Sequence, residues 1–171
     1  VVDATVGFEG QDLNIIGLAQ KNSKGIVLLV NKWDLIEKDT KSVKKFEEDI
    51  YEKMKPFNDV PIVFTSATTM QRVLKGIETA LEVYNSRKQR VPTNKLNDVL
   101  LPMIESHPHP SVKASYIKIK YVTQLPTKTP VFAFFANHPQ YIKESYKRFL
   151  ENQIRANFNF TGVPIAIVFR K

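Results

Sequence analysis

Residues with the chemistry to bind a purine base stand in two short stretches of the chain. The first is NKWD, residues 31–34, and the second is TSA, residues 65–67. Guanine presents two neighbouring donors, N1–H and the exocyclic amine, and a fixed carboxylate can accept a hydrogen bond from both at once. Adenine lacks this pair, so Asp34 would favour guanine by about 1–3 kcal/mol or more, because adenine would leave a buried charge unpaired. The two stretches therefore predict a guanine pocket.

The other polar residues of these stretches suit the same pocket. Asn31 either places its amide near guanine N7 or ties the neighbouring loops together, and the stem of Lys32 lies along the base with its ammonium in water. A backbone N–H at the turn of Ser66 and Ala67 would donate to O6, because small side chains let the backbone approach closely. The simpler alternative is that Asp34 caps a helix and Asn31 bonds loop backbone. We favour the pocket, and its predicted residues are Asn31, Lys32, Asp34, Ser66 and Ala67.

Alternating strands and helices would bring the two stretches together. Residues 26–30 are a continuous apolar run, typical of a strand buried on both faces of a parallel sheet, and residues 61–67 predict the next strand. Apolar spacings of three and four residues predict helices around 12–18, 43–54 and 77–84. This order predicts a doubly wound α/β sheet, in which ligands bind beyond the carboxyl ends of the strands. Both polar stretches stand at those ends.

The positive charge is concentrated in the second half of the chain. Residues 1–90 contain 14 Lys or Arg and 13 Asp or Glu, a balance of +1, whereas residues 91–171 contain 11 and 4, a balance of +7. The polar, basic stretch 85–94 separates the halves, so we expect one domain over 1–90 and a basic domain over 91–171. Such a charge is typical of contact with a phosphate backbone, and a merely soluble basic surface is the alternative.

The second half predicts a small α+β layer, with helices on one face of three strands. Helical spacing covers 93–106, where Pro102 should kink the helix or begin a separate turn, and 142–158. The predicted strands are YIKIKYV, PVFAFFAN and PIAIVF. Alternation in the first of them puts Tyr121 on the apolar side with Ile117 and Ile119, and the intervening lysines on the other.

Basic side chains of this half are candidates for RNA contact. The predicted set is Lys113, Lys118, Lys120, Lys147, Arg148 and Arg155, and further cations on surfaces we expect to be exposed are Lys128, Lys143 and Arg170. Tyr116 could offer its ring for stacking on a base. The alternative is that these residues only solvate the surface and that Tyr116 is a sheet-edge aromatic.

The polar stretches and the second half together resemble a known family. NKWD and TSA look like the fourth and fifth guanine-nucleotide motifs of the translation-factor-related GTPases. KIKYVTQLPTKTPVFAFFANHP, SYKRFLENQIRANF and GVPIAIVFRK are similar to the C-terminal part of the Der (EngA) family, bacterial tandem GTPases of ribosome assembly, and the resemblance runs from Val1 to Lys171. It implies a partial P-loop GTPase domain, built of the strands after the switch II motif, followed by a KH-like domain. It also implies GTP or GDP as ligand, and the large ribosomal subunit, its rRNA or the protein's own GTPase domains as partners.

The motifs that such GTPases place around the phosphates are absent from this sequence. It contains no G-x-x-x-x-G-K-[ST] and no D-x-x-G, and it lacks the switch-region Thr. The ligands of Mg²⁺ are therefore not in this chain, and we expect that the natural protein begins upstream. An apolar sheet edge at Val1 and Val2 would then be exposed, and we expect self-association through it.

Two further features narrow the mode of binding. The second half has a single glycine, Gly162, so it cannot form the G-x-x-G loop with which KH domains clamp single strands. We therefore expect contact by charge and shape with folded rRNA. The alternative is that the basic domain is an intramolecular regulatory or protein-interaction module that reports the nucleotide state of the GTPase domains.

Composition excludes several other classes. There is no cysteine, and no apolar run approaches the length that spans a bilayer, so we expect a cytoplasmic protein without disulfides or membrane contact. SHPHP, residues 106–110, has two histidines but no carboxylate cluster, and we expect no metal site there.

We expect no catalytic residues in this chain and no GTP hydrolysis by it alone, because phosphate and metal positioning provide most of the catalysis in phosphoryl transfer. Phosphate release from GTP should match a protein-free blank, and turnover well above the blank would contradict this.

Overall fold

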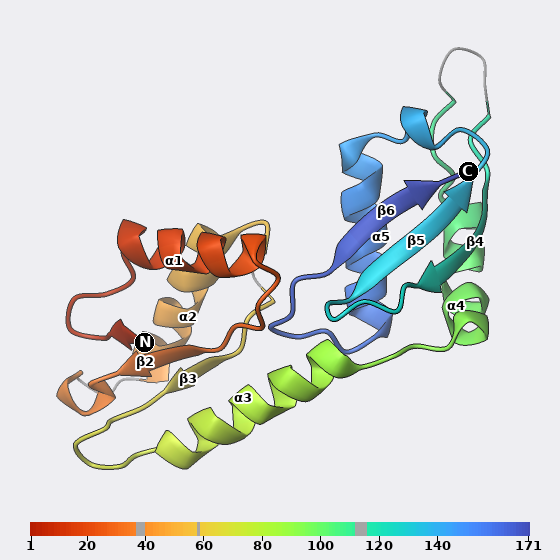
Figure 1. The fold of residues 1–171 in the computed structure, drawn as a ribbon. Helices are drawn as coiled ribbons and strands as arrows, with labels where there is room; N and C mark the ends of the chain where they lie inside the picture. Colours follow the sequence, from red (N-terminus) through yellow and green to blue (C-terminus); the bar gives the residue numbers. More distant parts are fainter. Residues whose placement is uncertain (37–39, 58, 112–115) are drawn as a thin grey trace. The chain divides into compact units, whose positions relative to one another are not determined.

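The structure is a computed structural model that describes residues 1–36, 40–57, 59–111 and 116–171 (Figure 1). The chain forms two compact units, each described here by itself. The first comprises Val1–Arg87 and Thr161–Pro164, and the second comprises Lys88–Phe160 and Ile165–Lys171. The chain therefore passes between the units three times.

The first unit contains a three-stranded parallel sheet in the order β1-β2-β3. Its strands are β1 (Val2–Asp3), β2 (Leu28–Asn31) and β3 (Ile62–Phe64). The helices between and after them are α1 (Gly10–Lys21), the 3-10 turn η1 (Trp33–Leu35), α2 (Thr40–Met54) and α3 (Val73–Lys88). This confirms the predicted parallel α/β organisation. The apolar run before NKWD lies in the middle strand, where Val30 is fully buried.

Helix α1 begins with a capping box, in which Glu9 is the N-cap residue and Asp12 is the third residue of the helix. The Asp12 carboxylate accepts a hydrogen bond from the Glu9 backbone N–H at 3.0 Å, and the Glu9 side chain caps the backbone of Asp12 in return. Ile16 of this helix is buried, whereas Leu18 is 62% exposed.

Helix α3 packs on the sheet through small residues instead of its predicted apolar face. A Cβ at Gly76 would lie 3.0 Å from the Leu29 side chain, so glycine permits a close approach to β2. Ile77, Leu81 and Tyr84, whose spacing predicted this helix, are instead more than half exposed.

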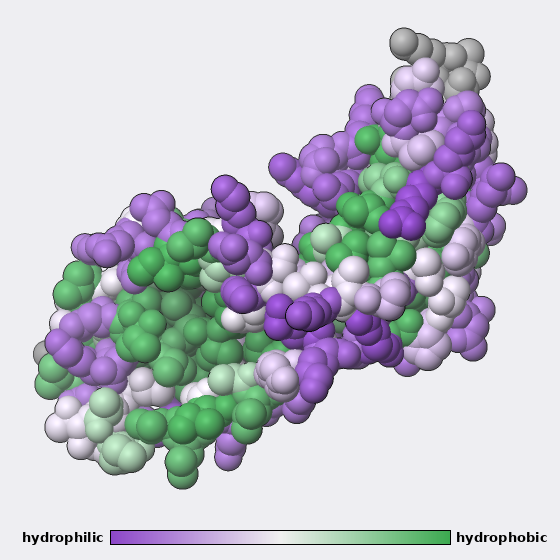
Figure 2. Space-filling view, in the orientation of Figure 1, coloured by the Kyte–Doolittle hydropathy of each residue, from purple (hydrophilic) through white to green (hydrophobic). Residues whose placement is uncertain are grey.

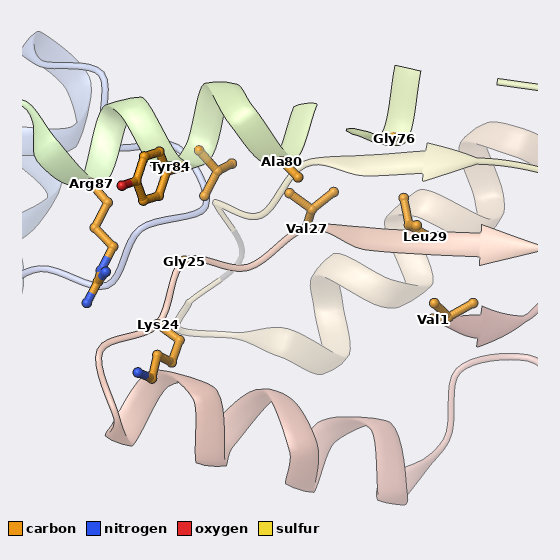
Figure 3. A pocket seen from close by; sticks show the side chains of 10 residues that line it. Val1, Lys24, Gly25, Val27, Leu29, Gly76, Ala80, Tyr84 and Arg87 are labelled. Carbon is orange, nitrogen blue, oxygen red and sulfur yellow. The ribbon is translucent and has the colours of Figure 1, made fainter. Parts of the chain in front are cut away.

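The first unit accordingly presents apolar surface. A cavity of about 400 Å³ opens between Val27 and Leu29 on one side and Gly76, Ala80 and Tyr84 of α3 on the other (Figure 3). Figure 2 shows hydrophobic side chains gathered over this unit between α1 and α3. Such an exposed apolar surface is suited to contact with another apolar surface.

Residues 161–164 return to the first unit and bond to segments that lead into β2 and β3. The Gly162 carbonyl accepts from the Ile26 N–H at 2.7 Å, and the Gly162 N–H donates to the Asp59 carbonyl at 2.7 Å. Gly162 has a φ of +71°, and a Cβ there would lie 2.6 Å from the Ile26 carbonyl oxygen. Only glycine fits this position without a backbone shift.

The second unit contains a sheet in the order β4-β5-β6, with β4 antiparallel and β6 parallel to β5. The strands are β4 (Ile119–Gln124), β5 (Val131–Ala136) and β6 (Ala166–Arg170), and the helices are α4 (Thr93–Ser106), η2 (Pro139–Tyr141) and α5 (Glu144–Asn157). Helix α5 lies behind β5 and β6 in Figure 1, so one face of the sheet is covered and the other is open. This confirms the predicted α+β layer. Pro102 lies inside a continuous α4 and begins no separate turn.

A register shift in β4 overturns the predicted alternation. The shift falls between Ile119 and Tyr121, after which Tyr121 pairs with Phe135 and Val122 with Phe134. Val122 is fully buried, whereas Tyr121 is 39% exposed. Because a bulge adds one residue, Tyr121 lies on the opposite side of the sheet from the buried Ile119.

The outer edge of β4 is closed by a side chain of α4. The Asn97 amide oxygen accepts from the Val122 N–H at 2.9 Å, and its NH₂ group donates to the Val122 carbonyl at 2.9 Å. The amide thereby bonds the backbone groups that a neighbouring strand would otherwise bond.

We predict that Gly162→Ala lowers the free energy of unfolding by about 2 kcal/mol or more, because the added Cβ meets backbone at a left-handed φ. Urea unfolding followed by fluorescence of Trp33, the one tryptophan of the chain, measures the effect. The control is Gly17→Ala in α1, where a Cβ meets nothing within 4 Å, and it should be neutral or stabilising. Equal effects of the two substitutions would contradict the prediction.

Candidate nucleotide site

The two predicted stretches meet at the carboxyl ends of β2 and β3. Two hydrogen bonds join them: the Trp33 N–H donates to the Thr65 carbonyl at 3.1 Å, and the Ala67 N–H donates to the Asn31 side-chain oxygen at 3.0 Å. Asn31 therefore ties the loops together, which is one of its two predicted roles. We expected a backbone N–H at the turn of Ser66 and Ala67 to donate to guanine O6, and in this structure the Ala67 N–H is engaged with Asn31.

Ser66 is held inside the second loop. It is fully buried, its N–H donates to the Gln71 carbonyl at 3.1 Å, and its hydroxyl oxygen accepts from the Thr69 N–H at 3.2 Å. The loop is therefore shaped by its own hydrogen bonds.

Lys32 pairs with a carboxylate that the sequence prediction did not include. Lys32 adopts a φ of 60°, and its Nζ lies 2.7 Å from Oδ2 of Asp3. The N–H and hydroxyl of Thr5 donate to Oδ1 of Asp3 at 2.9 and 2.7 Å. These interactions lower the pKa of Asp3 from its ordinary value of 3.8 to about 2. The hydrogen bond from Lys32 is the largest cause, and those from Thr5 come next. The signal that could have found Asp3 is its place at the carboxyl end of β1, beside β2.

Trp33 anchors the turn that carries Asp34. Its ring is buried against Phe64 and Phe46, with centroid distances of 4.3 and 5.8 Å. Asp34 follows in the same short turn, η1, and is half-buried. The aromatic contacts therefore set the direction of this turn relative to β3.

The predicted RNA-contacting residues of the second unit differ in their surroundings. Lys118, Lys120 and Arg148 are exposed, and Lys113 lies outside the described residues. Lys147 is half-buried, 3.5 Å from Glu144. The Arg155 side chain is only 12% exposed, and its guanidinium bonds Glu151 and the Phe160 carbonyl. Arg155 therefore stabilises the fold of its own unit.

His109 of the SHPHP stretch is also a structural residue. It is buried, its Nδ1 lies 2.6 Å from the Pro110 carbonyl, and its Nε2 accepts from the Lys143 N–H at 3.0 Å. The second bond requires that Nε2 carries no proton, so Nδ1–H donates to Pro110. Across the described ranges, no group of three or more His, Cys, Asp or Glu side chains could hold a metal ion. None of the helices described above is both long and apolar enough to cross a bilayer.

Two family profiles together match nearly the whole chain. A profile described as the elongation factor Tu GTP-binding domain matches residues 1–108. One described as the KH-domain-like domain of EngA bacterial GTPase enzymes, C-terminal, matches residues 90–170. The chain belongs to the Der/EngA GTPase family. This confirms the predicted resemblance and the fold class of both halves.

Curated Der relatives align with the whole of this chain. GTPase Der of Flavobacterium johnsoniae is 58% identical over 171 residues, and GTPase Der of Porphyromonas gingivalis is 56% identical over 172. Each alignment covers 100% of this chain and 39% of the relative, so the chain spans about two fifths of the length of these Der proteins. A solved structure of Era in complex with MgGDPNP and nucleotides 1506–1542 of 16S ribosomal RNA is 18% identical, with a TM-score of 0.43 over 98% of this chain and 62% of that one. That likeness is too distant to carry an argument about function.

We predict that the Asp3 carboxyl titrates near pH 2 in carbon-detected NMR. In Lys32→Met its midpoint should rise toward the ordinary value of 3.8, because the largest cause of the shift is removed. Because the folded pKa is depressed, the stabilisation from this ion pair is present above pH 3.8 and is lost as the pH falls toward 2. An unchanged midpoint in Lys32→Met would show that the ion pair is not the cause.

Proposed function

We propose that the first unit recognises the guanine base of GTP or GDP, and that the second unit contacts ribosomal RNA, as parts of a GTP-binding factor of large-subunit assembly. The observation that carries the proposal is the joining of NKWD and TSA by the Asn31–Ala67 bond at the carboxyl edge of the sheet. Ligands bind at this edge in open parallel sheets. The names of the Der relatives support the nucleotide, and the charge of +7 over residues 91–171 supports the RNA.

In the proposed complex Asp34 accepts from N1–H and the exocyclic amine, and the stem of Lys32 covers the base. The ion pair with Asp3 already holds Lys32 beside the site. The Ala67 N–H reaches O6 by sharing its hydrogen between the base and Asn31, or by turning away from Asn31. Binding of the base therefore replaces or shares an existing hydrogen bond. The gain in binding free energy is smaller than it would be for a donor without a partner.

The base test uses nucleosides, because this chain lacks the phosphate-binding motif. We predict that millimolar guanosine shifts the backbone amide NMR signals of residues 31–34 and 65–67, and that adenosine does not. Asp34→Asn should weaken guanosine binding by about tenfold or more and favour xanthosine. The reason is that an amide can donate to the carbonyl that xanthine carries in place of the amine. Asp49→Asn, at an exposed site in α2, is the matched control and should bind as the wild type does.

Equal shifts with adenosine and guanosine, or an Asp34→Asn variant that behaves like the control, would overturn the assignment of Asp34. Loss of guanosine binding without any gain for xanthosine would reduce Asp34 to a residue that shapes the loop.

We also propose that the apolar surface around α3 and the β1 edge supports association of two copies of this chain. Val1 is 83% exposed there, beside the cavity of Figure 3. Sedimentation velocity across a dilution series measures this association, and a single concentration-independent monomer would exclude it.

A further inference from the structure

The open face of the β4-β5-β6 sheet carries one row of three large side chains. Tyr121 of β4 pairs with Phe135 of β5, and Phe135 pairs with Arg170 of β6. Side chains of directly paired residues lie on the same face of a sheet. The fully buried Phe132 and Phe134 occupy the other, helix-covered face, so the row lies on the open face.

The two aromatic rings of this row stack on each other. Their centroids are 4.7 Å apart and their planes differ by 18°. Tyr121 is 39% exposed and Phe135 is partly exposed. Cross-strand stacking of two rings can stabilise a sheet. That role alone does not require the rings, or the apolar residues around them, to be exposed.

The neighbouring residues of this face have short side chains, and two exposed cations adjoin the aromatic pair. The next row is formed by Thr123, Ala133 and Val168, whose side chains are small or short. Figure 2 shows hydrophobic side chains over β5 and β6, with hydrophilic residues around them. Lys120, the bulge residue of β4, and Arg170 are both exposed cations.

We propose that the row of Tyr121, Phe135 and Arg170 is a stacking surface for unpaired bases of single-stranded RNA. This inference rests on the proposed RNA contact and deepens it. A base that adds to the Tyr121–Phe135 stack continues a column already aligned within 18°, and Arg170 and Lys120 meet the phosphates on either side. Duplex RNA cannot use this surface, because its base faces are hidden within the helix.

The positive charge of the second half of the chain favours RNA over a protein partner. An apolar protein surface offers no anion to the cations beside the aromatic pair, whereas each phosphate of an RNA backbone does. Residues 91–171 carry 11 cations against 4 anions, so an RNA strand meets attraction from the whole unit. Binding of RNA on the open face of the sheet also needs no G-x-x-G loop, which the second half lacks.

The test measures binding of residues 1–171 to fluorescein-labelled U10 and to a 10-base-pair RNA duplex, by anisotropy across a salt series. The key variant is Tyr121→Leu/Phe135→Leu, which keeps apolar side chains suited to a sheet but removes both rings. The control Tyr121→Phe keeps the ring. A separate variant, Lys118→Glu/Lys120→Glu, tests the RNA contact itself against Lys21→Glu/Lys24→Glu, which makes the same change of charge in the first unit.

We expect the Leu variant to bind U10 at least tenfold more weakly, with an unchanged salt slope and unchanged duplex binding. Tyr121→Phe should bind as the wild type does. Lys118→Glu/Lys120→Glu should weaken binding of both RNAs and flatten the salt slope. Thermal melting confirms that each variant is folded, and ring NMR signals of Tyr121 should shift when U10 is added.

The two proposals fail in different ways. If the Leu variant binds U10 like the wild type while the Glu variant does not, the stacking surface is wrong and the RNA contact stands. If the wild-type chain binds neither RNA, both proposals are wrong, and the regulatory-module alternative replaces them. If the Leu variant loses U10 and duplex binding equally, the rings support the sheet and do not read bases.

Discussion

The backbone of Gly162 is the point on which the arrangement of the first unit depends. Its N–H and carbonyl bond the Asp59 carbonyl and the Ile26 N–H, in segments that lead into β3 and β2. At the opposite ends of the same strands, Asn31 and Trp33 join the two polar loops. Strands β2 and β3 are therefore held at both ends, once by a segment more than 100 residues away in sequence and once by the residues of the two polar stretches.

These contacts at both ends of β2 and β3 explain why the proposed base site is shaped by the protein's own hydrogen bonds. Lys32 is paired with Asp3, and Ala67 is bonded to Asn31. Such a site changes little on binding, which limits the ordering cost, but every new bond to a base replaces a bond within the protein. In the proposed complex Asp34 discriminates between the bases, because guanine offers it two neighbouring donors and adenine does not.

The sequence allowed prediction of those features that depend on local pattern. The continuous apolar run before NKWD identified β2, and spacings of three and four residues identified α2, α3, α4 and α5. The fold class followed from the order of these elements and was confirmed. That Asn31 ties the neighbouring loops together was predicted as one of two roles, because both stretches end strands of a parallel sheet.

The features that escaped prediction depend on single residues or on distant contacts. A bulge of one residue moved Tyr121 to the other face of its strand, and alternation alone cannot reveal a bulge. The exposed Ile77 and Leu81 have the spacing of a core face, but close packing through Gly76 turned α3 differently. Nothing in the local sequence around Gly162 indicates its partners, because they lie in the other half of the chain.

The clamp of Asn97 on Val122 has a consequence for crowded surroundings. Sheets with bare edges tend to zip together when many copies are brought close. Here a chain that tried to add a strand beside β4 would first have to pull α4 away from both backbone groups of Val122. Copies of the basic unit concentrated on an anionic surface would thus be hindered from polymerising along that side.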